Sequence, residues 1–246
     1  MAHSLIIIPT YNERENVAEM IRQVMAFEEG FDLLFVDDAS PDSTAGVIKA
    51  MMPDYPNRIH LIERSGKLGL GTAYITGFKW ALEHGYDFIF EMDCDFSHPV
   101  SALPLLYSPV AHEGYDMAIG SRYVKGGGIK DWPFLRRTIS YGASLYVRTV
   151  TWMPVKDPTA GFVCYKRAIL ERLDLDAIEF KGYGFQIEMK YAAYRLGYKI
   201  KEVPITFTDR KLGTSKMSSS IFGEAFHGVI KLSRRACKGS FPVTRK

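Results

Sequence analysis

Short apolar runs alternate with segments of helical spacing through the first half of the chain, and this alternation restricts the fold most. Each run is bounded by polar turn residues, as buried strands are. The five strand-like runs are Leu5–Ile8, Leu33–Val36, Arg58–Glu63, Phe88–Phe90 and Tyr115–Ile119. Strands that alternate with helices predict a Rossmann-like α/β domain. Its central sheet is mostly parallel and doubly wound, with helices on both faces.

Composition fits one large α/β domain and excludes several classes of protein. The 246 residues are 47% hydrophobic, and a net charge of +3 does not indicate a nucleic-acid partner. Cys94, Cys164 and Cys237 form no Cys-x-x-Cys pair, so we expect reduced thiols in a cytosolic setting and no zinc site. We expect no signal peptide, and no apolar stretch approaches the ~18 residues of a membrane-spanning helix.

Two aspartates, Asp93 and Asp95, follow the apolar run Phe88–Phe90. Open α/β sheets place their ligand crevices at the carboxyl ends of such strands. Because two adjacent carboxylates repel each other, a divalent cation is the natural compensation, and oxygen ligands suit Mg²⁺ or Mn²⁺. An Asp-x-Asp pair by itself is a weak signal, since many surface loops carry one. The role of the Asp93/Asp95 pair therefore has to be judged together with the residues that follow the other strands.

Acids and glycines follow the neighbouring strands. Asp38 lies at the end of the second strand, where a carboxylate can bind a ribose hydroxyl or a base N–H. The turn Pro9–Glu13 lacks the Gly-x-Gly-x-x-Gly of dinucleotide-binding folds, and Arg64–Ala73 lacks the P-loop lysine motif. The glycines of Arg64–Ala73 either bind an anion at a helix N-terminus or form only a tight turn.

Basic residues gather in two later segments. Three glycines end the segment Gly120–Gly128, which predicts a mobile loop, and Arg136 and Arg137 begin a helix that reaches about Trp152. Arginine forks bind phosphates through two parallel hydrogen bonds, although a solvated charge cluster is the alternative. The segment Thr208–Lys216 is a second basic loop.

The tail, residues 218–246, is predicted to be separate from a domain of residues 1–217. Apolar residues form one stripe of a helix, and basic residues cluster at its end. The stripe contains Ile221, Phe222, Ala225, Phe226, Val229 and Ile230, and the cluster Lys231, Arg234, Arg235 and Lys238. The pattern fits a helix on an anionic membrane surface. It fits equally a helix packed on the body with a solvated basic end.

Seven short motifs span nearly the whole chain, and they follow one another in the same order as in a known enzyme family. They are Pro9–Glu13, Val36–Asp42, Lys67–Tyr74, Met92–Pro99, Gly120–Tyr123, Gly182–Gln186 and Asp209–Lys216. Together they resemble the family 2 glycosyltransferases of the GT-A fold. The resemblance is closer to the dolichyl-phosphate and polyprenyl-phosphate mannosyltransferases, in a short form without transmembrane helices. Cys94 departs from the commoner Asp-Ala-Asp, and we expect this central residue to contribute its backbone.

The resemblance implies a GDP-mannose donor and a dolichyl or polyprenyl phosphate acceptor. The residues implied for the nucleoside pocket are Pro9, Tyr11, Glu13, Val36 and Asp38. Those implied for the ribose and metal are Asp93, Cys94 and Asp95, with Asp93 and Asp95 as ligands of Mg²⁺ or Mn²⁺. Those implied for the phosphates are Arg122, Arg210 and Lys216. For the acceptor phosphate we assign Arg122 with Arg136 or Arg137, and we count Asp95, Arg122 and Arg136 as catalytic. Asp157, Gln186 and Glu188 are candidates for the sugar pocket.

A lipid phosphate is already largely dianionic at neutral pH, so it needs no general base. A single displacement would invert the anomeric carbon and give a β-linked product. We expect a cytoplasmic protein held peripherally at the membrane surface, without nucleic acid, and a membrane-anchoring partner is left open. The alternatives are another sugar, such as glucose from UDP-glucose, a polysaccharide acceptor with Asp157 or Glu188 as base, or a nucleotide-binding subunit without catalysis.

Overall fold

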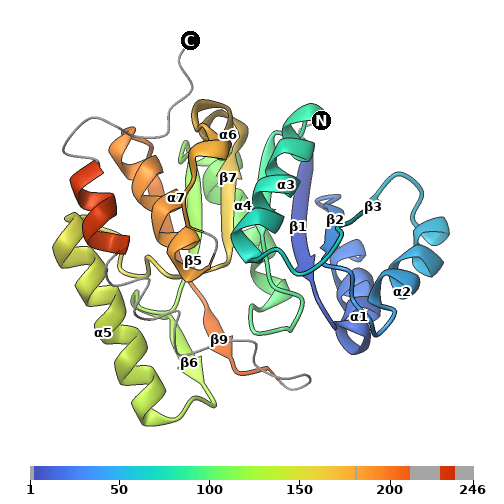
Figure 1. Cartoon of the computed structure of the whole chain (residues 1–246), viewed down its shortest axis with the longest axis horizontal. Helices are drawn as coiled ribbons and strands as arrows, with labels where there is room; N and C mark the ends of the chain where they lie inside the picture. Colours follow the sequence, from blue (N-terminus) through green and yellow to red (C-terminus); the bar gives the residue numbers. More distant parts are fainter. Residues whose placement is uncertain (1–2, 181, 211–227, 236–246) are drawn as a thin grey trace.

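The computed structural model describes residues 3–180, 182–210 and 228–235. Its main sheet has seven strands in the order β3-β2-β1-β4-β7-β5-β8, and helices cover both faces (Figure 1). The strands are β1 (Ser4–Thr10), β2 (Asp32–Asp37), β3 (Ile59–Glu63), β4 (Phe88–Glu91), β5 (Met117–Ser121), β7 (Val163–Lys166) and β8 (Ile200–Pro204). The predicted mixed α/β fold with a mostly parallel sheet is confirmed.

Seven labelled α-helices and three short 3-10 helices are described in these residue ranges, in addition to a helix of residues 228–235. The α-helices are α1 (Arg14–Met25), α2 (Thr44–Met51), α3 (Leu70–Glu83), α4 (Leu103–His112), α5 (Phe134–Thr151), α6 (Arg167–Arg172) and α7 (Tyr183–Arg195). The 3-10 helices are η1 (Met52–Asp54), η2 (Val100–Ala102) and η3 (Leu175–Ala177).

The strand β7 is the exception to the parallel sheet. It lies between β4 and β5 and is antiparallel to both, whereas β1 pairs in parallel with β2 and β4, and β5 with β8. Strand direction depends on where the preceding connection enters the sheet, and the apolar run Val163–Tyr165 carries no signal for it. The chain reaches β7 from α5 through residues 152–162, which lie along the site edge of the sheet.

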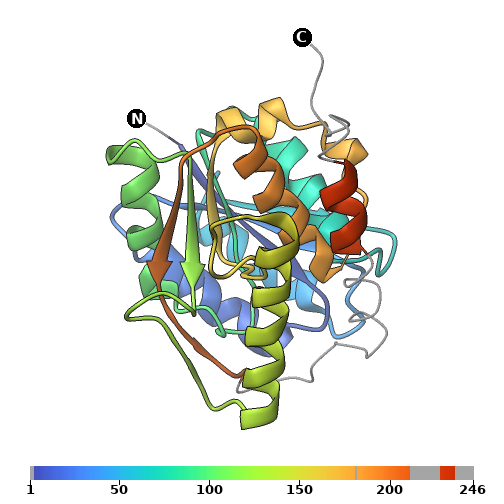
Figure 2. The ribbon, with the colours of Figure 1, turned by 90° about the vertical axis from the view of Figure 1, so that its left-hand side faces the viewer.

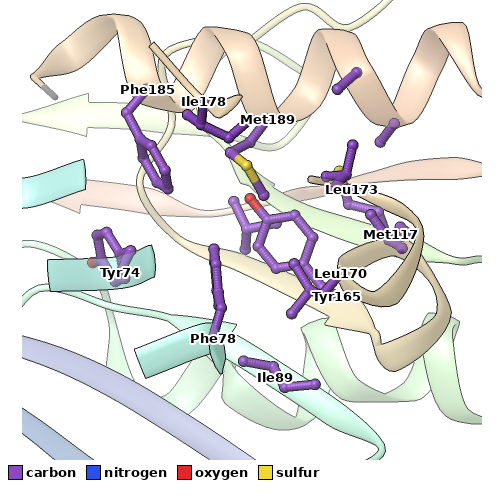
Figure 3. Packing of buried hydrophobic residues seen from close by; sticks show 14 of the residues in the cluster. Tyr74, Phe78, Ile89, Met117, Tyr165, Leu170, Leu173, Ile178, Phe185 and Met189 are labelled. Carbon is purple, nitrogen blue, oxygen red and sulfur yellow. The ribbon is translucent and has the colours of Figure 1, made fainter. Parts of the chain in front are cut away.

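The core consists of one apolar layer on each face of the sheet. Residues alternate along β1, so Ile6 and Ile8 pack with α1 and α4, whereas Leu5 and Ile7 pack with α3. On the second face, the rings of Tyr74 and Phe78 from α3 meet side chains of β7 and α7 (Figure 3). This packing holds α7 close to β4 and β7, which matters for the polar residues that α7 carries.

A two-stranded ribbon lies outside the main sheet. It consists of β6 (Gly128–Lys130) and β9 (Thr206–Thr208), which pair in parallel. The mobile loop predicted for Gly120–Gly128 is wrong at Gly128, where β6 begins. The sequence of Lys199–Phe207 also has the pattern of one continuous strand, but the structure divides it into β8 and β9. The predicted strand is broken at Ile205, whose backbone bonds both Ser121 and Gly128 and so turns the chain out of the sheet.

Residues 228–235 form a helix that packs beside α5 and α7 (Figure 1). Val229 and Leu232 are 3% and 2% exposed and belong to the main apolar layer. Lys231 and Arg235 form ion pairs with Glu179, at 2.7 and 3.1 Å. For these residues the packed alternative is correct, and the predicted boundary at 217/218 does not separate them from the body. The rest of the tail lies outside the described residues.

Replacing Gly228 by alanine is expected to lower the free energy of unfolding by about 1–3 kcal/mol, the usual cost of overpacking. A Cβ at this position would lie 2.3 Å from Cε1 of Phe180, and the Phe180 ring is itself held against Gly184. Gly142→Ala on α5 is the matched control, since a Cβ there meets nothing within 4 Å. The control should gain about 1 kcal/mol from helix propensity. Urea unfolding of both variants checks this, and equal stability would show that the 228–235 helix is not seated as described.

Candidate functional site

Polar loops follow the parallel strands β1, β2 and β4 at one edge of the sheet. Thr10 ends β1 and donates a hydrogen bond of 2.8 Å from its hydroxyl to Asp37, which ends β2. The backbone N–H of Asp38 donates to the carbonyl of Thr10 at 2.9 Å. The carboxylate of Glu13, in the loop after β1, is close enough to raise the pKa of Asp93, in the loop after β4. The loops therefore converge, as predicted.

Backbone strain concentrates in these same loops. Asn12, Ala39 and Phe96, which follow β1, β2 and β4, have φ values of 55°, 52° and 58°. Asparagine tolerates this left-handed region, but for other residues it costs roughly 1–2 kcal/mol. Strained residues of this kind cluster at ligand sites and active sites.

Asp93 and Asp95 lie together in the loop after β4. The Asp95 carboxylate is 7% exposed, accepts the N–H of Ser97 at 3.0 Å and forms an ion pair of 3.0 Å with Arg210. The Asp93 side chain is 39% exposed. Partial removal from water and the charge of Asp95 together raise the pKa of Asp93 above its usual value. The electrostatics of the pair therefore favour a bound cation.

The two aspartates fit a hard divalent cation whose remaining ligands come from a substrate. Within the described residues, no group of three or more His, Cys, Asp or Glu could hold a metal ion. The Arg210 guanidinium on Asp95 shows that this carboxylate accepts a cation. Mg²⁺ typically takes one or two carboxylates, with substrate phosphates and water completing its shell. An oxygen donor set of this size suits Mg²⁺ or Mn²⁺.

The side chain of Cys94, between the two aspartates, does not face them. It is 2% exposed and packs in the apolar layer with α1 and α4. The burial agrees with the expectation that this position contributes its backbone to the site. Because the thiol is buried in this layer, it cannot be a metal ligand. The replacement of alanine by cysteine in the Asp-Ala-Asp motif therefore changes the packing of the core and not the site.

His98 is a buried part of the same loop. Its Nδ1 accepts the backbone N–H of Asp93 at 3.4 Å, and its ring stacks on Phe162 at 5.2 Å. Burial lowers the pKa of His98 to about 4, so the imidazole is neutral. His98 thus fixes the turn that carries Asp93, and it is a packing residue.

The residues predicted for the nucleoside pocket lie at the ends of β1 and β2, but two of them are already engaged. The Asp38 carboxylate accepts from Nε of Arg64 at 2.5 Å and is almost buried. Val36 is fully buried, so only its main chain can contact a ligand.

An open cavity of about 160 Å³ borders the start of α1, and it is lined by Asn12, Glu13, Arg14, Glu15, Asn16 and Asp42. Pro9 precedes this segment, and the Lys67 ammonium lies 5.0 Å from the Tyr11 ring.

Arg122 is held by a buried carboxylate. Its Nε and Nη2 donate to the two oxygens of Asp157 at 2.7 and 2.6 Å, and Asp157 is fully buried. The carboxylate of Asp157 therefore fixes the guanidinium. It is not available to line a sugar pocket, which is the role that the sequence predicts for it. Glu188 is also fully buried, and it accepts the N–H groups of Glu179 and Phe180 at 3.0 and 3.1 Å. The predicted sugar-pocket role of Glu188 is therefore wrong too.

Trp132 brings the predicted acceptor arginines together. The guanidinium carbons of Arg136 and Arg122 lie 4.0 and 5.8 Å from the centre of its ring. Arg136 also forms an ion pair of 2.9 Å with Asp209, the residue before Arg210. Because Arg210 pairs with Asp95, these contacts connect the arginine cluster to the acid pair. Arg137 lies exposed beside Arg136, and Lys216 lies outside the described residues.

Comparison with known proteins identifies the family. The family model described as "Glycosyl transferase family 2" matches residues 5–174. The chain belongs to this family. Two of its relatives are the "Polyprenol monophosphomannose synthase" of Mycolicibacterium smegmatis and the "Undecaprenyl-phosphate mannosyltransferase" of Micrococcus luteus. The first is 44% identical over 92% of this chain and 85% of the relative, and the second 46% identical over 92% of each.

A third relative and the solved structures extend these comparisons. The "Dolichol-phosphate mannosyltransferase" of Pyrococcus furiosus is 36% identical, over 93% of this glycosyltransferase chain and 63% of the relative. Among solved structures, glucosyl-3-phosphoglycerate synthase from Mycobacterium tuberculosis superposes with a TM-score of 0.67 at 18% identity, over 96% of this chain and 80% of the other. This likeness supports the GT-A fold alone. Of the helices that the structure describes in this chain, none has the length and apolar character needed to cross a membrane.

Proposed function

We propose that the protein transfers mannose from GDP-mannose to a polyprenyl or dolichyl phosphate, with inversion, and releases GDP. The observation that carries this proposal is the line of contacts from Asp95 through Arg210 and Asp209 to Arg136. A donor diphosphate at the acid pair and an acceptor phosphate at the arginines would then be neighbours. The names of the relatives support mannose as the sugar and a polyprenyl-type phosphate as the acceptor.

At the donor side, Asp93 and Asp95 would hold Mg²⁺ or Mn²⁺ against the donor diphosphate. The bound ion would supply Lewis-acid neutralisation of the leaving GDP. Arg210, which pairs with Asp95 in this structure, would hold the diphosphate together with Lys216, which lies outside the described residues. Pro9, Tyr11, Glu13, Asp38 and the backbones of Val36 and Cys94 form the nucleoside side, with Arg64 holding the Asp38 carboxylate in place.

At the acceptor side, Arg122 and Arg136 bind the lipid phosphate, and Arg137 lies next to them. Asp157 orients Arg122, so the guanidinium is fixed before the phosphate arrives. A phosphate with a second pKa of about 6 is already a nucleophile at neutral pH. A polysaccharide hydroxyl would instead need a base, and both candidate bases, Asp157 and Glu188, are buried and engaged. Their engagement favours the lipid phosphate.

The helix α5 is the proposed membrane face. Arg136 and Arg137 lie in its first turn, and its outer side is apolar and unusually exposed. Figure 2 shows α5 at the front of the molecule, on its outside. The exposed residues are Phe134 (83%), Leu135 (70%), Ile139 (48%), Tyr141 (53%) and Leu145 (47%), with Trp152 (84%) just beyond its end. Such a patch with adjacent basic residues is typical of a helix on an anionic membrane. A cytoplasmic protein held at the membrane in this way would receive the lipid phosphate at the start of α5.

The double variant Phe134→Ser/Leu135→Ser is expected to lower binding to anionic vesicles by at least about tenfold. Full burial of each such side chain is worth roughly 1.5–3 kcal/mol, and about 1.4 kcal/mol corresponds to a factor of ten. Leu105→Ser is the matched control, because Leu105 is 57% exposed but lies on α4. Vesicle sedimentation measures the binding. If the double variant binds as well as the control, α5 is not the membrane face.

Acceptor choice tests the proposed function directly. With one labelled GDP-mannose, the label should move to polyprenyl phosphate and not to an oligosaccharide. Label on the oligosaccharide would support the polysaccharide alternative, and use of UDP-glucose in place of GDP-mannose would support another sugar. Tight GDP binding without turnover, in the presence of Mn²⁺ and lipid phosphate, would point to a nucleotide-binding subunit.

A further inference from the structure

A polar cluster is buried beneath Asp93, where β4, β7 and α7 meet. Both carboxylate oxygens of Glu91, Nε2 of Gln186 and the hydroxyl of Tyr165 make no well-formed hydrogen bond among the described residues. Gln186 and Tyr165 are nevertheless close enough to Glu91 to lower the pKa of its carboxyl. Tyr165 lies in the apolar layer between α3 and α7, and its hydroxyl points toward α7 (Figure 3). Buried polar groups are rarely left unpaired, so each one needs a reason.

Lys190 organises this cluster. The residue is fully buried, and its Nζ donates to the carbonyl of Ala160 at 2.6 Å, to the carbonyl of Gln186 at 3.2 Å and to Oε1 of Gln186 at 2.9 Å. An ammonium group has three donors and no acceptor, so these contacts use all of them. Glu91 supplies the nearby opposite charge. Lys190 therefore anchors both α7 and the turn that precedes β7.

The contact with Lys190 fixes which way the Gln186 amide faces. Because Oε1 is held by the ammonium, Nε2 must point to the other side. A Cβ built on Gly161 would meet Nε2 of Gln186 at 3.9 Å, Oδ2 of Asp93 at 4.0 Å and Cε1 of His98 at 3.7 Å. The amide nitrogen and the Asp93 carboxylate thus border the same space. Gln186 is 3% exposed, and its amide has two neighbours, this space on one side and the Glu91 carboxylate on the other.

Gly161 keeps this space open. Its φ lies outside the left-handed region, so the backbone does not require glycine there. Contacts of 3.7–4.0 Å are ordinary van der Waals distances, so an alanine would fit without a clash. Glycine at this position leaves free at least the volume of one methyl group beside Asp93 and Gln186.

We propose that Nε2 of Gln186 donates a hydrogen bond to a hydroxyl of the donor sugar, and that Lys190 is the positioning residue that fixes this amide. The inference rests on the proposed function and adds a determinant of sugar specificity to it. The same hydroxyl can donate to Asp93 while it accepts from Gln186. A site built to hydrogen-bond a hydroxyl discriminates against sugars that lack it or orient it differently, because its own polar groups are then left unpaired.

Two independent variants test the proposal. Gln186→Glu keeps the oxygen that Lys190 binds but replaces the amide donor, and Gly161→Ala fills the proposed sugar volume. Each should lower kcat/KM for GDP-mannose by roughly ten- to a hundredfold and reduce the preference for GDP-mannose over its 2-epimer GDP-glucose. The Kd for GDP, which has no sugar, should stay within about twofold of wild type. Lys79→Met on α3 is the control, because its ion pair with Asp176 lies on the surface.

Lys190→Met, combined with Glu91→Gln to avoid an unpaired buried carboxylate, should lower the mannose preference by a similar factor. A merely structural role for these residues would weaken GDP binding as well, or leave the ratio of the two donors unchanged, and either result would overturn the inference. Failure of the proposed function looks different, because the wild-type protein itself would then form no mannosyl lipid from GDP-mannose in the same assay.

Discussion

Asp95→Asn is expected to slow mannosyl transfer by about a hundred- to a thousandfold and to change the free energy of unfolding by less than about 1 kcal/mol. The carboxylate is the inner of the two proposed cation ligands, at 7% exposure, and asparagine keeps its shape without its charge. Charge that develops on the leaving diphosphate would then lack most of its compensation. The free energy of unfolding should change little, because two effects oppose each other. Asparagine loses the ion pair with Arg210, but it also removes the repulsion between Asp93 and Asp95.

Initial rates over a titration of Mg²⁺ and Mn²⁺ measure this effect, together with urea unfolding of the same samples. Asp176→Asn is the matched control, because Asp176 is 79% exposed and pairs with Lys79 on the surface. The control should transfer mannose at the wild-type rate. If Asp95→Asn did the same, the acid pair would not be the cation site.

Lys190→Met is expected to lower the free energy of unfolding by about 3–5 kcal/mol, the cost of breaking a buried charge pair by removing one partner. Both Lys190 and Glu91 are fully buried, and neither oxygen of Glu91 makes a well-formed hydrogen bond in the described part of the chain. Burial lowers the pKa of Lys190 to about 8 and raises that of Glu91 to about 7, so each charge depends on the other. Methionine would leave the carboxylate without its counter-charge.

Adding Glu91→Gln to Lys190→Met should recover a large part of the lost stability, because the unpaired charge is then gone. Urea unfolding measures the single and the double variant. Lys79→Met serves as the control, since its ion pair with Asp176 is exposed and should be worth about 1 kcal/mol or less. A single variant as stable as this control would mean that Lys190 and Glu91 are not coupled in the folded protein.

Local sequence patterns were sufficient for most of the sheet. The runs of β1, β2 and β4 are apolar on both faces and are followed by polar turns, so their positions and the site edge could be predicted. The antiparallel direction of β7 could not, because it depends on the path of the chain after α5. The ribbon of β6 and β9 was hidden by glycines at Gly126–Gly128, which are as typical of a loop as of a close backbone approach.

At the site, the chemistry of single residues could be predicted but their partners could not. Asp95 and Arg122 were selected from the sequence, whereas the pair of Arg122 with Asp157 joins residues far apart in the chain. Lys190 gave no signal, since a lysine within a helix is usually solvated. The apolar residues of α5 were similarly uninformative, because helical spacing predicts a buried face. Only the structure shows that Val147 is buried whereas Leu135 is exposed.

The measurement that tests the central claim most directly is transfer from GDP-mannose to polyprenyl phosphate by the purified protein with Mg²⁺ or Mn²⁺. We predict a β-linked mannosyl phospholipid and an equal amount of GDP, with no product after chelation of the metal. Release of free mannose without a lipid product, or formation of the lipid from UDP-glucose but not from GDP-mannose, would contradict it.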